Sequence, residues 1–128
     1  MLFRSLSVDM DPVRHRIVLN KGSRDGAYIG QALIDAQGVV GQITRDQVFT
    51  SEAVLITDPD HAVPVEFVRT GQRTIAMGTG EFDRLSLPFL TRNADVQTGD
   101  LLVTSGLGGT FPAGYPVGSV AEIGRAHV

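Results

Sequence analysis

The sequence lacks cysteine and tryptophan altogether, and it contains a single lysine among its 128 residues. Without cysteine the chain can form neither a disulfide bond nor a thiolate metal site, although this absence is compatible with any compartment. No apolar run approaches the roughly 18 residues of a membrane-spanning helix, and the first residues do not begin a signal peptide. We therefore expect the chain as written to be soluble, and its abrupt end is compatible with an origin in a longer protein.

A strong positive charge is also missing, because 14 acidic residues outnumber 11 basic ones and the formal net charge is −3. Sequence-independent nucleic-acid binding needs a cationic face, so nucleic acid is not an expected partner. The six phenylalanines and two tyrosines do not interleave with basic residues. An OB-type oligonucleotide-binding module therefore stays only as an alternative.

Glycine and proline are abundant and evenly spread, with 15 and 6 residues respectively, and the longest stretch free of both is 42–58. Glycine and proline at such short intervals favour many short strands over helices. Apolar residues alternate with polar ones in 13–19, 63–67 and 85–89, which is the period of a half-buried strand. Shorter apolar clusters predict further strands at 32–34, 39–40, 53–56, 101–103 and 117–123. Only residues 50–52 offer room for a helical turn.

About nine strands in a chain of this length predict an all-β fold made of two small β-barrels packed together, with one larger sandwich as the other possibility. The turn-rich segment 57–60 suggests a first barrel over residues 1–57 and a second over 58–128. A terminal strand that crosses over to the other half stays open. Barrels of about 60 residues are marginally stable alone, so we expect the halves to share an interface.

One constellation matches the chain order of a trypsin-like serine hydrolase. His15 would be the general base, Ser105 the nucleophile, and Asp58 or Asp60 the carboxylate that orients the histidine. Ser105 lacks the G-x-S-x-G surroundings of a nucleophile elbow, and the arginines on both sides of His15 disfavour its protonated form. We keep the hydrolase as an alternative and interpret His15 as a partly buried strand residue and Ser105 as a turn hydroxyl.

No metal or cofactor site is indicated. His15, His61 and His127 are far apart and show no ligand spacing. Residues 58–61, Asp-Pro-Asp-His, are typical of a solvated turn. The glycine-rich segment 106–109 fits neither a dinucleotide-binding loop nor a P-loop. We therefore expect no cofactor and no metal.

Two groups of motifs, taken in order and spacing across residues 8–124, resemble the extracytoplasmic core of the MreC family of rod-shape-determining proteins. The first group begins with Ile-Val-Leu-Asn-Lys-Gly-Ser-Arg-Asp-Gly, and the second begins with Gly-Asp-Leu-Leu-Val-Thr-Ser-Gly-Leu-Gly-Gly. The matching segments are 17–26, 30, 39–43, 55–59 and 99–118.

The resemblance implies two small β-barrels whose arrangement is similar to that of chymotrypsin-like proteases without their active site. It implies no catalytic residues, and hence no enzyme. It also implies that this chain is the periplasmic domain of a single-pass inner-membrane protein whose membrane anchor lies outside the sequence.

The partners implied by the resemblance belong to the elongasome, which synthesises sidewall peptidoglycan and maintains rod cell shape. The core would be a scaffold that binds, positions and activates a class B penicillin-binding protein, the elongation transpeptidase. It would also self-associate as a homo-oligomer or filament. The full-length protein would cooperate with MreD, RodZ and MreB.

Two sets of residues are candidates for particular roles. Aromatic side chains in or near turns are favoured interface anchors, and these candidate partner-binding residues are Tyr28, Phe49, Phe111 and Tyr115. The residues of the family signature are expected to shape tight turns and close strand contacts rather than touch a partner. They are Gly22, Gly26, Gly41, Asp58, Pro59, Gly106, Gly109, Pro112, Gly114 and Gly118.

Overall fold

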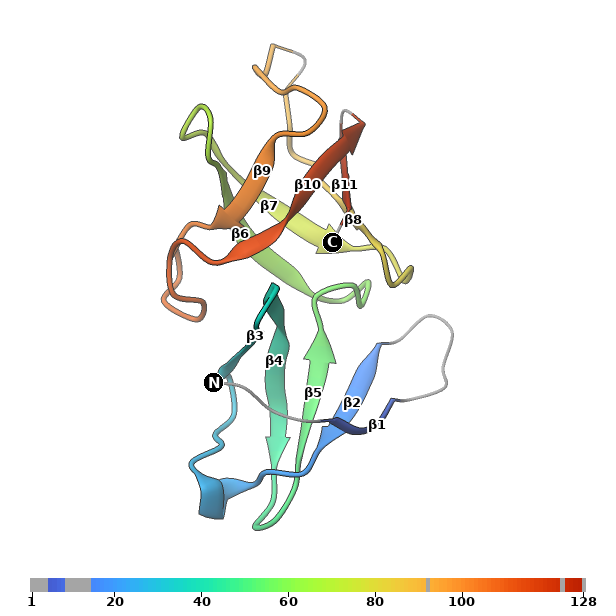
Figure 1. Ribbon diagram of the computed structural model, residues 1–128, viewed down its shortest axis with the longest axis vertical. Helices are drawn as coiled ribbons and strands as arrows, with labels where there is room; N and C mark the ends of the chain where they lie inside the picture. The colour runs from blue at the N-terminus through green and yellow to red at the C-terminus, as the bar shows by residue number, and fades with distance from the viewer. Residues whose placement is uncertain (1–4, 9–14, 92, 123, 128) are drawn as a thin grey trace.

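The computed structural model describes residues 5–8, 15–91, 93–122 and 124–127 of the chain. These residues form two stacked units of β-structure (Figure 1). The sheet unit consists of β1 (Ser5–Val8), β2 (Arg16–Leu19), the short 3-10 helix η1 (Ser23–Asp25), β3 (Ala32–Asp35), β4 (Gly38–Asp46) and β5 (Ser51–Leu55). The barrel unit consists of β6 (Ala62–Phe67), β7 (Arg73–Gly78), β8 (Arg84–Ser86), β9 (Leu101–Thr104), β10 (Pro116–Glu122) and β11 (Arg125–His127).

The sheet unit is a five-stranded antiparallel sheet in the order β1-β2-β5-β4-β3. The stretch 42–58, which is free of glycine and proline, supplies most of the β4–β5 hairpin. The room for a helical turn at 50–52 is not used, because β5 begins at Ser51 and pairs with both β2 and β4. Its small core contains Ile17, Leu19, Ala27, Leu33, Ile43 and Ala53.

The barrel unit closes on itself in the order β10-β11-β8-β7-β6-β9, with antiparallel pairing throughout. The predicted alternation in 63–67 is confirmed, because Val63, Val65 and Phe67 are fully buried in β6. In 85–89 it holds only at its start, since β8 ends at Ser86 and Phe89 is exposed. The sequence did not predict β7 or β11 as strands.

The two units share a core at their junction. Val39 of β4 and Ile56, which follows β5, belong to the same buried cluster as the side chains inside the barrel. Gly38 lies so close to β10 that a Cβ atom there would be 2.2 Å from the carbonyl oxygen of Pro116. Figure 1 shows this end of the β3–β4 hairpin directed at the barrel.

The all-β prediction is therefore confirmed, with one closed barrel and a second sheet. Among the described residues no pairing closes the first sheet, and no strand crosses to the other unit. The two sheets are joined by residues 56–61. The boundary between 57 and 58 stays a prediction, as does the chymotrypsin-like arrangement of the two units.

Candidate functional site

The residues of the possible serine-hydrolase triad do not assemble into one. His15 is fully buried, and its ring Nδ1 lies 2.6 Å from the hydroxyl oxygen of Thr57. The Asp58 carboxylate does not contact that ring. It accepts hydrogen bonds from the main-chain N–H groups of His15, at 2.8 Å, and Asp60, at 2.9 Å.

Ser105 has a local role as well. Its hydroxyl oxygen accepts a hydrogen bond from the N–H of Leu107 at 3.3 Å, and its own N–H donates to the carbonyl of Pro64. Among the described residues no hydrogen bond joins the ring of His15 to Ser105 or to a carboxylate. The arrangement that a nucleophile and its base require is absent here.

The histidines and carboxylates show no grouping suited to a metal ion. Within the described ranges no cluster of three or more potential ligands from histidine, aspartate and glutamate occurs. The segment 58–61 is not the solvated turn that the sequence predicted, because Asp58 and His61 are buried. The carboxylate of Asp58 accepts two main-chain bonds, and the ring of His61 contacts Gln42.

Several signature residues lie where the backbone is crowded or sharply turned. A Cβ atom on Gly22 would be 2.2 Å from the carbonyl oxygen of Gln47, and one on Gly41 would be 2.0 Å from that of Val54. Both distances are far below van der Waals contact, so only glycine allows these segments to approach each other. Asp58 is buried beside the half-buried Pro59, and Gly26 follows η1 with a positive φ.

Most of the remaining signature residues lie in the loop between β9 and β10. Thr104 anchors this loop, because its hydroxyl donates to the carbonyl of Pro112 and accepts from the N–H of Tyr115. A Cβ on Gly106 would touch the side chain of Ala113 at 3.0 Å. Gly109 and Gly114 also lie in this loop, and Gly118 lies in β10. These positions are consistent with a shaping role, which stays a prediction.

The four candidate partner-binding aromatics fall into two environments. Tyr28, Phe49 and Tyr115 are exposed, at 59%, 61% and 40%. Phe111 requires a correction, because its side chain is only 3% exposed and belongs to the core of the barrel. Its ring meets that of His61 edge-on, so it packs inside the molecule and does not offer a surface contact.

Two further apolar residues accompany the exposed aromatics of the sheet unit. Ile29 is 64% exposed beside Tyr28, and Val48 is 56% exposed beside Phe49. We call these four residues the apolar end. They lie in the segment after η1 and in the β4–β5 turn, and Figure 1 shows this turn at the end of the sheet farthest from the barrel.

Backbone hydrogen bonds join η1, which precedes Tyr28 and Ile29, to the β4–β5 turn, which carries Val48 and Phe49. The N–H of Ser23 donates to the carbonyl of Gln47 at 2.7 Å, and that of Arg24 donates to the carbonyl of Val48 at 3.2 Å. The guanidinium of Arg24 lies over the ring of Phe49, 5.1 Å from its centroid, which is within the range of a cation–π contact. The β4–β5 turn is thus held against η1. In the sequence, this surface is indicated only by two pairs of adjacent apolar residues in or near turns, at 28–29 and 48–49.

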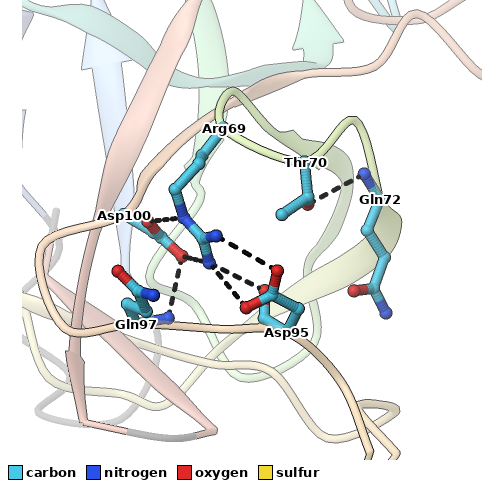
Figure 2. Close-up of polar contacts among 6 residues, drawn as sticks. All are labelled: Arg69, Thr70, Gln72, Asp95, Gln97 and Asp100. Carbon is cyan, nitrogen blue, oxygen red and sulfur yellow. Dashed lines mark hydrogen bonds and ion pairs between the residues drawn. The ribbon is translucent and has the colours of Figure 1, made fainter.

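A polar cluster joins the β6–β7 turn of the barrel unit to the loop before β9 (Figure 2). Arg69 binds the carboxylate of Asp100 with two hydrogen bonds, of 2.8 and 2.9 Å, and also contacts Asp95 at 3.2 Å. The N–H of Gln97 donates to Asp100 at 2.8 Å. The Arg69 hydrogen bonds first, and this N–H second, lower the pKa of Asp100 to about 2, while the two carboxylates raise the pKa of Arg69. This bidentate pairing fixes the loop before β9.

Comparisons with known proteins identify close relatives. The family model for the rod shape-determining protein MreC, barrel core, matches residues 6–127. The cell shape-determining protein MreC of Haemophilus influenzae is 49% identical over 120 residues, which cover 94% of this chain and 34% of that protein. The chain thus spans about a third of the length of this relative.

Solved structures agree with the sequence comparison. The crystal structure of MreC from Pseudomonas aeruginosa superposes with a TM-score of 0.94 at 41% identity, covering 98% of this chain and 87% of that one. A more distant match at 20% identity, with a TM-score of 0.70 and coverage of 99% and 82%, shares the fold. It comes from a complex between penicillin-binding protein PBP2 and MreC of Helicobacter pylori.

No helix among the described residues is long and apolar enough to cross a membrane. The match to the family model extends over both the sheet unit and the barrel unit. The motifs that resembled the family in the sequence are thus accompanied by its fold. On these grounds the chain belongs to the MreC family of cell shape-determining proteins.

Proposed function

We propose that this chain is a non-catalytic scaffold of the elongasome that binds a class B penicillin-binding protein. The observation that carries the proposal is the apolar end, where Tyr28, Ile29, Val48 and Phe49 expose large side chains on the sheet unit. Exposed aromatic anchors of this kind dominate the energetics of protein interfaces. The complex of a distant relative with PBP2 supports the class of partner.

The proposed mechanism is positioning and activation. A bound protein shifts a conformational equilibrium of the transpeptidase only by the difference between its affinities for the two states. A rigid β-frame suits this role, because it loses little conformational entropy on binding. In this proposal, the chain binds the active state of the transpeptidase more tightly and so raises its population during sidewall growth.

Self-association is a second part of the proposal. The sheet unit ends at β1 on one side and at β3 on the other. End strands carry unpaired backbone groups that can pair with another chain. Homo-oligomers or filaments would then place several copies of the binding surface in a row.

Family membership supports a proposal for the cellular setting. We place the chain on the periplasmic side of the inner membrane, as a domain of a single-pass membrane protein. MreD, RodZ and, across the membrane, MreB are proposed partners of the full-length protein. Each of these partners can be tested separately by co-purification with the full-length protein from membranes.

The central experiment measures binding between this chain and the periplasmic part of the class B penicillin-binding protein of the same organism by biolayer interferometry. Replacing Tyr28 and Phe49 together with serine is expected to weaken binding at least about tenfold. Val68→Ser is the matched control, because Val68 is equally exposed, at 57%, but lies on the barrel unit. Binding by the folded wild-type chain that is undetectable at high micromolar concentration would refute the proposal.

A further inference from the structure

His61 joins the two units of the molecule. It lies in the connection just before β6, and its ring Nε2 is 3.1 Å from the side-chain oxygen of Gln42 in β4. The amide nitrogen of Gln42 donates to the carbonyl of Gly30 at 3.2 Å, which fixes the orientation of that amide. Its oxygen therefore faces the histidine, so Nε2 carries the proton and Nδ1 is bare.

The other ring nitrogen of His61 has no partner. Nδ1 is buried and makes no hydrogen bond to any residue that the structure describes. The neutral ring tolerates this position, but a proton on Nδ1 would create a buried charge without an acceptor. The charged group that faces the ring is the Asp58 carboxylate, and both its oxygens already accept main-chain bonds. Gln42 and Phe111, which pack against the ring from β4 and from the β9–β10 loop, are uncharged.

The surroundings of His61 make the protonated ring unfavourable in the packed junction. Burial lowers the pKa of the imidazole below its ordinary value of 6.5, and the attraction of Asp58 offsets part of this effect. A junction that opens to water removes the burial and restores the ordinary pKa. Protons therefore favour the open junction.

A second contact across the junction is partly exposed to water and lies beside a cavity. Phe82, in the β7–β8 turn of the barrel unit, stacks on His15 of the sheet unit with ring centroids 3.7 Å apart. Phe82 is 59% exposed, so the stack is open to water on one side. A cavity of about 220 Å³ lies beside it, lined by residues of both units that include Val40, Leu55 and Pro116.

We propose that the junction between the sheet unit and the barrel unit is a pH-dependent hinge, which stays packed while His61 is neutral and loosens when the ring takes up a proton. This inference goes beyond the scaffold function, because it concerns the angle between the apolar end and the barrel. At acidic pH, a partner could no longer contact the apolar end and the barrel unit in the same relative orientation. The loosening begins as pH falls below about 6.5, and the opening constant rises at most about tenfold per pH unit.

The absence of cysteine makes the hinge directly measurable. Gln47→Cys in the β4–β5 turn and Thr98→Cys in the β8–β9 loop place spin labels at exposed positions on opposite units. Distances between the labels are measured by pulsed electron paramagnetic resonance at pH 7.5 and pH 5.0. We expect one narrow distribution at pH 7.5 and a second, broader population at pH 5.0. Identical distributions at the two pH values would overturn the proposal.

Two histidine variants test whether the pH-dependent change in distance comes from His61. His61→Gln keeps a side-chain donor for Gln42 but cannot take up a proton, so the narrow distribution should persist at pH 5.0. His127→Gln is the matched control, because His127 is exposed in β11 and should leave the pH response intact. A response that survives in His61→Gln would refute the role of His61.

A measurement on the unsubstituted histidine covers the case in which His61→Gln does not fold. Long-range proton–nitrogen correlation spectra of the wild-type chain report the tautomer and charge of each imidazole. We expect His61 to be neutral with the proton on Nε2 at pH 7.5, and to titrate below 6.5 together with the distance change. A ring that is charged at pH 7.5, or that titrates without any distance change, would contradict the hinge.

Discussion

The sheet unit and the barrel unit solve the problem of stability differently. The barrel closes on itself and so has no free strand edge. Among the described residues its core cluster contains thirteen buried hydrophobic side chains, one of them from the sheet unit (Val39) and one from the connection between the units (Ile56), against six in the sheet core. The sheet ends at β1 and β3 and presents the apolar end. The comparison shows that the larger core and the exposed anchors lie in different units.

The two units are nevertheless coupled. Val39 and Ile56 complete the barrel core from the sheet side. A binding surface on a small sheet is thereby stabilised by a larger neighbour. The predictions below test this division, beginning with the largest expected change in stability.

Phe67→Ala should be the most destabilising change. Phe67 is fully buried in the closed barrel, and removing its ring leaves a cavity that costs about 3–5 kcal/mol in the free energy of unfolding. Leu19→Ala in the sheet core is the comparison, at about 2–5 kcal/mol. Because the units share a core, urea denaturation should show one cooperative transition for both variants. Two separate transitions would mean that the units fold independently.

Gly38→Ala should be the next most destabilising change. Gly38 has a φ of 141° and its Cβ would overlap the carbonyl of Pro116, so the substitution combines backbone strain with a clash. We expect a loss of about 1–3 kcal/mol in the free energy of unfolding. Gly71→Ala is a control for strain alone, because Gly71 also has a positive φ but nothing lies within 4 Å of its Cβ position. An equal loss in both variants would show that the close contact between the units contributes nothing.

Asp100→Asn should remove one cause of the loss of stability that the barrel unit undergoes in acid. The folded carboxyl has a pKa of about 2 instead of 3.8, so its ion pair stabilises the fold above pH 4. That contribution is lost as the pH falls from 3.8 towards 2. The difference in melting temperature between wild type and Asp100→Asn should therefore be largest at pH 6 and shrink at pH 2.5.

The control for this ion pair is Asp95→Asn, because Asp95 is 69% exposed and water screens its contact with Arg69. We expect a much smaller change in melting temperature than for Asp100→Asn. A difference between wild type and Asp100→Asn that stays constant with pH would contradict the assignment.

Phe49→Ala should have the smallest effect on folding. The ring is 61% exposed and lies under the guanidinium of Arg24, so the free energy of unfolding should change by less than about 0.5 kcal/mol. Circular dichroism melting checks this value. A larger loss would mean that the apolar end supports the sheet itself, and the binding experiment would then need a different variant.

Alternation and turn residues predicted the all-β fold and most of its strands. β6 could be predicted because Val63, Val65 and Phe67 alternate without interruption. β7 was missed, because Ala76 is its only fully buried residue and its other side chains are partly exposed. A strand with partly exposed side chains on one face and only small buried side chains on the other shows little alternation of apolar and polar residues.

The candidate surface was only partly predictable. Tyr28 and Phe49 were correctly expected in or near turns, where they are exposed. Phe111 was expected there too, but the β9–β10 loop folds its ring into the barrel against His61. A turn residue can point inward or outward, and its local sequence does not distinguish the two.

The sequence by itself determined most of the segments that become strands and many of the turns, because these depend mainly on neighbouring residues. Only the tertiary structure decided that the second half closes into a barrel while no pairing among the described residues closes the first. It also decided that Asp58 binds main-chain groups instead of orienting a catalytic histidine, and that His61 contacts Gln42. These outcomes depend on contacts between distant residues, and the period of a strand does not specify its neighbour.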